Sequence, residues 1–217
     1  MIERILGLRQ KWGDPTFPVE VPPERFDQFQ DRVPDALLGY WREYGFSGFN
    51  DGMWWICDPV VWQPAVDVWT RHLNLAMGED AWIAITRNAF GDMDLWGQRT
   101  GMSLSIIPYR GWVFPTDKSE RMASPQSKDR QIYARFISLS KDSADVLGED
   151  KKGLFDRVLA ALGPISVDTM YGFVPVPALG GPMLPGHVEI FDAGVHMQLL
   201  SDLTPRRVMG DITKLPD

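Results

Sequence analysis

The segment YWREYGFSGFNDGMWWICDP, residues 40–59, contains three of the nine tryptophans and the only cysteine of the chain. Because each large aromatic side chain buries roughly 150–250 Å², this density indicates either a core or the floor of a binding groove. One helical face is formed at spacings of three and four by Leu37, Leu38, Trp41 and Tyr44. Gly45 can end that helix with a positive φ, and residues 53–57 then read as a short strand. We therefore expect a helix-turn-strand unit that anchors the core.

The composition is that of an ordinary globular protein, with 217 residues, 44% hydrophobic and 24% charged. The net charge of −7 argues against direct binding to nucleic acid or to anionic membranes, which require Lys and Arg. Neither a signal peptide nor a run of about 18 apolar residues is recognisable, so we expect a cytoplasmic protein. A single cysteine, Cys57, excludes an internal disulfide, and its apolar neighbours predict a buried, unreactive thiol.

The strongest strand pattern covers residues 81–109, where three short runs rich in β-branched and aromatic residues are separated by turn residues. This pattern predicts an antiparallel meander. In the middle run, Asp94, Trp96 and Gln98 alternate with apolar residues, which is typical of a sheet with one face in water. The expected fold class is mixed α+β, with a central, mostly antiparallel sheet flanked by helices.

A polar stretch divides the chain. Residues 116–130 lack an apolar period and read as a linker or loop between an N-terminal region, 1–115, and a C-terminal region, 131–217. We expect the two regions to pack as one body. In the second region, residues 131–140 alternate like a strand, residues 169–181 read as an ordered loop, and a helix is expected over residues 188–203. The residues expected to face inward in that last helix are Ile190, Val195, Leu199 and Leu200.

Few residues are arranged as catalytic or metal-binding motifs require. None of the three histidines, His72, His187 and His196, forms an HxH or HExxH pair. Asp92 and Asp94 form a DxD motif that would place two carboxylates on one side of a strand, where they could hold a divalent cation. Two solvated aspartates explain the motif better, because no further acidic ligands follow. We therefore predict no catalytic residues, cofactor or metal.

Four separated segments, in this order, resemble the GAD-like family with its associated C-terminal domain. They are YWREYGFSGFNDGMWWICDP, ITRNAFGDMDLWG, LGPISVDTMYGFVPVPALGG and HMQLLSDLTP. The resemblance covers most of the chain, and the matching residues, among them Arg87, Phe90 and Tyr171, look structural. The family includes immunity proteins for DNase effectors of the bacterial type VI secretion system. The resemblance therefore implies a cytoplasmic, non-enzymatic protein that binds and neutralises a cognate toxin, with a nuclease as the expected partner.

An acidic protein is electrostatically suited to a basic nuclease. The candidate contact residues are the acids at the predicted turns and strand edges, with one aromatic neighbour: Asp51, Asp58, Asp92, Asp94 and Trp96. Two alternatives remain open at this point. One is a small-molecule-binding protein or hydrolytic enzyme that uses a groove lined by Trp54, Trp55 and Trp96. The other is an interaction module without a toxin partner.

Overall fold

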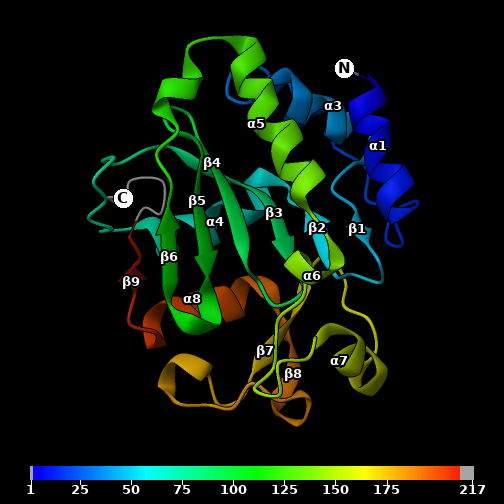
Figure 1. The fold of residues 1–217 in the computed structure, drawn as a ribbon, viewed down its shortest axis with the longest axis vertical. Helices are drawn as coiled ribbons and strands as arrows, with labels where there is room; N and C mark the ends of the chain where they lie inside the picture. The colour runs from blue at the N-terminus through cyan, green and yellow to red at the C-terminus, as the bar shows by residue number, and fades with distance from the viewer. Residues whose placement is uncertain (1, 211–217) are drawn as a thin grey trace.

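The computed structural model describes residues 2–210 and shows eight α-helices and nine strands within them (Figure 1). The N-terminal elements are α1 (Ile2–Trp12), α2 (Pro23–Phe29), α3 (Asp35–Tyr44), β1 (Gly48–Phe49), β2 (Trp54–Ile56), α4 (Pro59–Thr70), β3 (Trp82–Asn88), β4 (Met93–Gly97), β5 (Gly101–Ile107) and β6 (Trp112–Pro115). The remaining elements are α5 (Pro125–Ser138), α6 (Lys141–Ala144), α7 (Phe155–Leu162), β7 (Thr169–Phe173), β8 (Val188–Asp192), α8 (Ala193–Leu203) and β9 (Arg207–Val208). Four short 3₁₀ helices are η1 (Pro108–Arg110), η2 (Ser119–Met122), η3 (Pro177–Leu179) and η4 (Pro185–His187).

A seven-stranded sheet in the order β1-β2-β3-β4-β5-β6-β9 forms the centre of the molecule. All neighbouring strands pair antiparallel except β6 and β9, which are parallel. A second, two-stranded sheet is formed by the antiparallel pair β7 and β8. The meander expected over residues 81–109 is confirmed as β3, β4 and β5, and the fold is mixed α+β as predicted.

Helices cover both faces of the large sheet, so the expectation of one water-facing side is wrong (Figure 1). On one face α1, α3 and α5 pack together, and their core includes Trp54, Ile83 and Trp96. On the other face α4 and α8 pack over Met93 and Leu95. The alternation along β4 is therefore real, but it separates two buried cores rather than a core from solvent.

The helix-turn-strand unit predicted over residues 40–59 is confirmed as α3, β1 and β2. Gly45 ends α3 with φ +67°, and the N–H of Gly45 donates to the Trp41 carbonyl. Phe49 and Trp54 stack with ring centroids 4.4 Å apart. Trp54 is 0% exposed and Trp55 1%, so these rings form core and not the floor of a groove.

The strand expected over residues 131–140 is wrong, because this segment belongs to the helix α5. The same residues carry a helical spacing, with Ile132, Tyr133 and Phe136 all buried on one side. The helix starts within the expected linker, where the Ser124 hydroxyl accepts from the Ser127 N–H. Residues 125–130 are therefore the first turns of α5.

Two further expectations in the second region need correction. The expected loop at residues 169–181 begins with the strand β7, in which Tyr171 is fully buried. The helix expected over residues 188–203 starts only at Ala193, because Val188–Asp192 is the strand β8. As a result Ile190, Val195 and Leu199 are exposed, and only Leu200 of the four expected residues is buried.

Contacts between the two regions are extensive. The buried Arg87 of β3 donates from Nη2 to the carbonyls of Ser166, Val167 and Thr169, at 3.1–3.2 Å. Its guanidinium also lies between the rings of Trp55 and Trp62, 5.0 Å from each centroid. In addition, β9 extends the sheet that the N-terminal region builds. Arg87 thus ties the central sheet to the segment that leads into β7.

The single cysteine behaves as its neighbours predict. Cys57 is free and 1% exposed, at the end of β2. Burial raises the pKa of its thiol to about 12, so the thiol stays protonated at neutral pH. Within residues 2–210, no helix has the length and apolar character needed to cross a membrane.

Candidate functional site

Asp51 and Asp58, two of the candidate contact residues, lie at turns. Asp51 is exposed, with φ +57°, and its backbone N–H donates to the Thr16 hydroxyl. Asp58 caps the N-terminus of α4 by accepting from the Val60 N–H, and it pairs with Arg25 at 3.0 Å. Asp51 therefore presents an accessible carboxylate, whereas Asp58 is largely committed to the scaffold.

Asp92 lies just before β4 and faces inward. Its Oδ2 accepts from the Asn88 side-chain amide at 2.9 Å and from the Tyr109 hydroxyl at 3.4 Å. Although part of the residue is exposed, Oδ1 is buried and lacks a hydrogen-bond partner. Burial raises the pKa of Asp92 to about 7. This carboxyl group is a feature of the scaffold, with little surface for a partner.

Asp94 joins the sheet to α5. Its carboxylate pairs with Arg135 at 2.5 Å and accepts from the hydroxyls of Ser105 and Thr86, at 2.7 and 3.1 Å. Asp92 and Asp94 thus engage different partners, and among residues 2–210 no three His, Cys, Asp or Glu side chains are placed to hold a metal ion. Trp96, the fifth candidate, is 1% exposed and offers a partner almost no surface.

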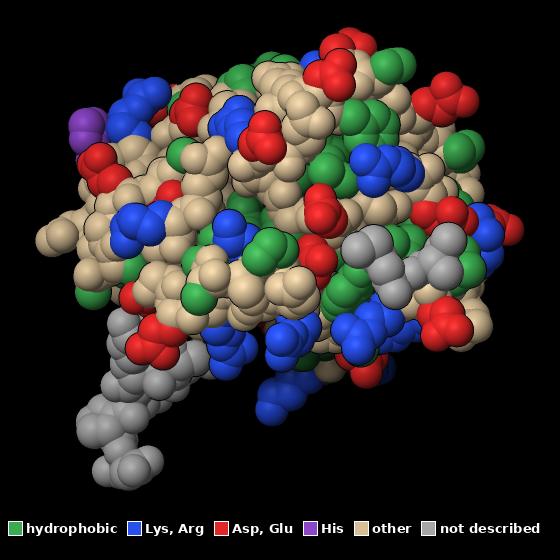
Figure 2. All heavy atoms as spheres, turned by 90° about the horizontal axis from the view of Figure 1, so that it is seen from above, with side chains coloured by type: hydrophobic (Ala, Val, Ile, Leu, Met, Phe, Trp, Pro, Cys, Tyr) green, Lys and Arg blue, Asp and Glu red, His purple; other side chains and the backbone are tan. Residues whose placement is uncertain are grey.

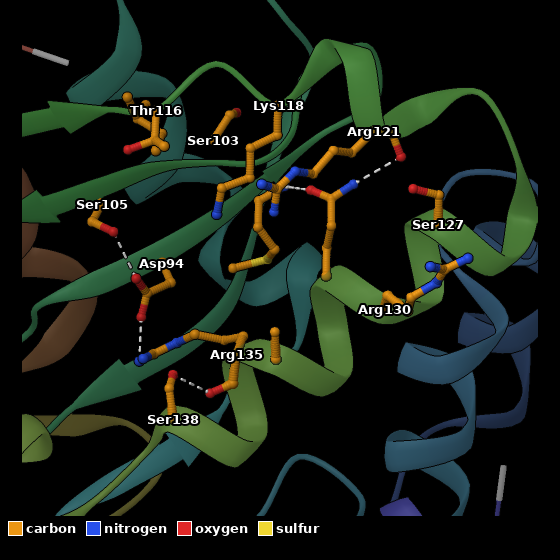
Figure 3. Close-up of a pocket in the computed structure, with 14 residues that line it drawn as sticks. Asp94, Ser103, Ser105, Thr116, Lys118, Arg121, Ser127, Arg130, Arg135 and Ser138 are labelled. Atoms are coloured by element: carbon orange, nitrogen blue, oxygen red, sulfur yellow. Dashed lines mark hydrogen bonds and ion pairs between the residues drawn. The ribbon is translucent and has the colours of Figure 1, made fainter. Parts of the chain in front are cut away.

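A polar cleft of about 550 Å³ lies beside Asp94, between the strands β4 and β5 and the helix α5 (Figure 3). Four basic side chains and one carboxylate line it: Lys118, Arg121, Arg130, Arg135 and Asp94. Figure 3 shows Lys118 and Arg121 extending over the cleft, whereas the guanidinium of Arg130 points away from them. The cleft is therefore a cationic site in a protein whose net charge is −7.

This cleft was not predicted, because residues 116–130 read as a linker and residues 131–140 as a strand. The helix α5, which forms one wall of the cleft, was therefore not expected. The available signal was the concentration of basic residues between positions 118 and 135. Within this range Gln131 and Arg135 are four residues apart, which places them on one side of a helix. Gln131 is buried, accepts from the Met102 N–H at 3.2 Å and donates to the Arg121 carbonyl at 3.2 Å. It fixes both sides of the cleft.

A second surface is formed by the start of α4 and by α8. Exposed apolar side chains follow α8 at intervals of four residues, with Val195 70%, Leu199 45% and Leu203 46% exposed. A hollow lined by Val61, Asp168 and Asp192 lies between the start of α4 and the start of α8. We call these six residues the α4–α8 surface.

The opposite end of the molecule has a different character. Figure 2 shows the face seen from above, where acidic, basic and hydrophobic side chains are interspersed. The α4–α8 surface combines a stripe of exposed aliphatic side chains with acidic neighbours. Large exposed aliphatic side chains in a stripe are typical of protein interaction sites.

Two segments of the chain match models of known protein families. Residues 3–109 match the model of the GAD-like domain, and residues 131–204 match the model of the T6SS immunity protein Tdi1, C-terminal. The crystal structure of Atu4351 from Agrobacterium tumefaciens is similar in fold, with a TM-score of 0.79 and 20% sequence identity. The similarity covers 96% of this chain and 91% of that chain. None of the curated proteins compared with the chain matches it.

The fold and the two matches define the class: a GAD-like domain followed by an immunity-type C-terminal domain on one α+β scaffold. The chain belongs to the GAD-like family through residues 3–109. Its residues 131–204 belong to the family of the Tdi1 immunity C-terminal domain, as the resemblance implied.

Proposed function

We propose that this protein is an immunity protein that binds a cognate type VI secretion toxin in the cytoplasm and blocks its active site. The observation that carries the proposal is the match of residues 131–204 to the Tdi1 immunity C-terminal domain. A nuclease is the toxin class that best suits an acidic inhibitor, because nucleases carry basic surfaces for their substrate. The protein acts by binding and not as an enzyme.

The α4–α8 surface is the proposed contact site. Five of its six residues lie within residues 131–204, the part that matches the immunity domain, and three of these are on α8. Val195 and Leu199 supply apolar area whose burial would stabilise a complex by roughly 25 cal/mol per Å² before association costs are subtracted. Exposed Asp168 and Asp192 lie at its edge. An apolar centre with an acidic rim complements a partner with an apolar centre and a basic rim.

Asp51 is a further exposed acid, outside the α4–α8 surface. Its turn lies against the C-terminal region, because a Cβ on Gly52 would lie 3.1 Å from Ile165 Cγ1. We propose Asp51 as a steering residue, whose loss would slow association more than it would speed dissociation.

The experiment is co-expression with the toxin encoded next to this gene. The wild-type protein should restore growth and co-purify with the toxin, and Val195→Asp combined with Leu199→Asp should abolish both. Ile137→Asp is the matched control, because Ile137 is 60% exposed on α5, away from the α4–α8 surface. Failure of the wild-type protein to rescue or bind would refute the proposed function, whereas rescue by the double variant would refute only the surface.

A further inference from the structure

We propose that the cleft between β5 and α5 binds a small phosphorylated sugar, with its phosphate held by Arg121. This inference is independent of the toxin-binding surface. It rests on the charge of the cleft, on its hydroxyl-bearing walls and on its size.

The charge balance of the cleft favours an anion. Among residues 2–210, Asp94 is the one acidic residue that lines the cleft, and its carboxylate already pairs with Arg135 and accepts from Ser105 and Thr86. Arg121 is exposed, and within residues 2–210 no carboxylate lies within ion-pair distance of its guanidinium. The Arg121 side chain extends over the cleft (Figure 3). Its planar guanidinium can bind two phosphate oxygens at once.

The walls of the cleft suit a hydroxylated ligand. Thr116 lies on one side and Ser127, in the first turn of α5, on the other. Serine and threonine hydroxyls both donate and accept hydrogen bonds, as sugar hydroxyls require. Within residues 2–210, no aromatic side chain lines the cleft to serve as a stacking platform for a nucleobase.

The size of the cleft points to a small molecule. About 550 Å³ is far more than a phosphate ion fills and lies within the usual range of small-molecule sites, roughly 300–1,000 Å³. The wall of the cleft is also held in place before binding. Gln131 bridges the backbone of β5 and the segment that carries Arg121, and the Arg135–Asp94 pair joins α5 to β4. A wall held in this way lowers the ordering cost of binding.

The test is isothermal titration calorimetry of the purified protein with ribose 5-phosphate, inorganic phosphate and ribose. We expect saturable binding of ribose 5-phosphate, at least tenfold weaker binding of inorganic phosphate, and no binding of ribose. Arg121→Gln should weaken the binding of ribose 5-phosphate at least tenfold. Lys128→Gln removes the same charge from a side chain on α5 that does not line the cleft, so it should change the affinity less than twofold.

Two results would overturn the proposal. One is the absence of saturable ribose 5-phosphate binding to a folded wild-type protein. The other is an equal effect of the two variants, which would indicate general electrostatics and no site. Binding of a single-stranded oligonucleotide without binding of ribose 5-phosphate would count against a small-molecule site in the same way. Because Arg121 lies outside the α4–α8 surface, Arg121→Gln should still rescue cells from the toxin, so the two proposals fail separately.

Discussion

At the scale of single residues, Asp92 and His196 couple folding to pH in opposite directions. Burial raises the pKa of Asp92 from 3.8 to about 7, so the folded state binds this proton more tightly than the unfolded chain. That stabilisation is complete below about pH 4 and is lost as the pH rises through 7. Burial lowers the pKa of His196 from 6.5 to about 4, so its contribution is present above pH 6.5 and is lost as the pH falls towards 4.

We expect Asp92→Asn to stabilise the protein relative to wild type at pH 8, by on the order of 1–2 kcal/mol, and to have little effect near pH 4. The amide oxygen can still accept from Asn88 and Tyr109, while the cost of ionising a buried carboxyl group is removed. Urea denaturation at several pH values measures the difference. The same change at the exposed Asp51 is the control, and a pH-independent difference for Asp92→Asn would contradict the prediction.

His196→Leu should show the opposite pH dependence. Both ring nitrogens of His196 are buried without hydrogen-bond partners, and the ring stacks on Phe191 with centroids 4.3 Å apart. A leucine removes the group that gains a proton on unfolding, so the variant should lose less stability than wild type between pH 6.5 and pH 4. The same denaturation series measures this, and parallel curves for variant and wild type would exclude the coupling.

At the scale of elements, the junction between β3 and the segment before β7 depends on Arg87. The side chain is 2% exposed, and burial lowers the pKa of its guanidinium to about 10, which leaves it charged at neutral pH. We expect Arg87→Met to reduce the free energy of unfolding by roughly 2–4 kcal/mol, because three carbonyls lose a charged donor and two tryptophans lose a cation–π contact.

The matched control for this junction is Arg71→Met, at the exposed end of α4, which should change stability by less than about 0.5 kcal/mol. Chemical denaturation at pH 7 compares the two variants. Equal effects of both substitutions would show that Arg87 acts only through net charge.

At the scale of the whole molecule, the two regions should unfold together. All nine tryptophans lie within residues 1–115, so their fluorescence reports on the N-terminal region, whereas far-UV circular dichroism also reports on α5, α7 and α8. Because β9 pairs with β6 and α8 packs against α4, we expect coincident urea transitions by the two probes. Separate midpoints would show that residues 131–217 unfold as an independent domain.

The parts of the fold that were predictable from the sequence are those specified by local interactions. The α3 face with Leu37, Trp41 and Tyr44 has one clear period, and Gly45 supplies the positive φ that ends the helix. The meander β3-β4-β5 has short strands separated by turn residues. In each case neighbouring residues alone set the element and its end.

The errors occurred where one pattern fits two elements. Residues 131–140 alternate and also repeat at three and four, and the choice of a helix depends on packing Ile132 and Phe136 against α3 and the sheet. The surroundings of the candidate contact residues could not be read from the sequence for a related reason. Asp94 reads as a surface acid, yet Arg135, 41 positions along the chain, comes within 2.5 Å of it only because α5 crosses the sheet.

The sequence by itself determined the two-part family, the α+β class and the helix-turn-strand unit at residues 40–59, because these depend on local periodicity and on the order of motifs. Only the tertiary structure decided the role of that unit. Trp54 and Trp55 lie in the hydrophobic core, and Arg87, which contacts Trp55, joins the C-terminal region to the central sheet. It also decided which acids are accessible, and it created the cationic cleft and the α4–α8 surface. Burial and charge pairing depend on segments distant in the chain, whose approach no local pattern records.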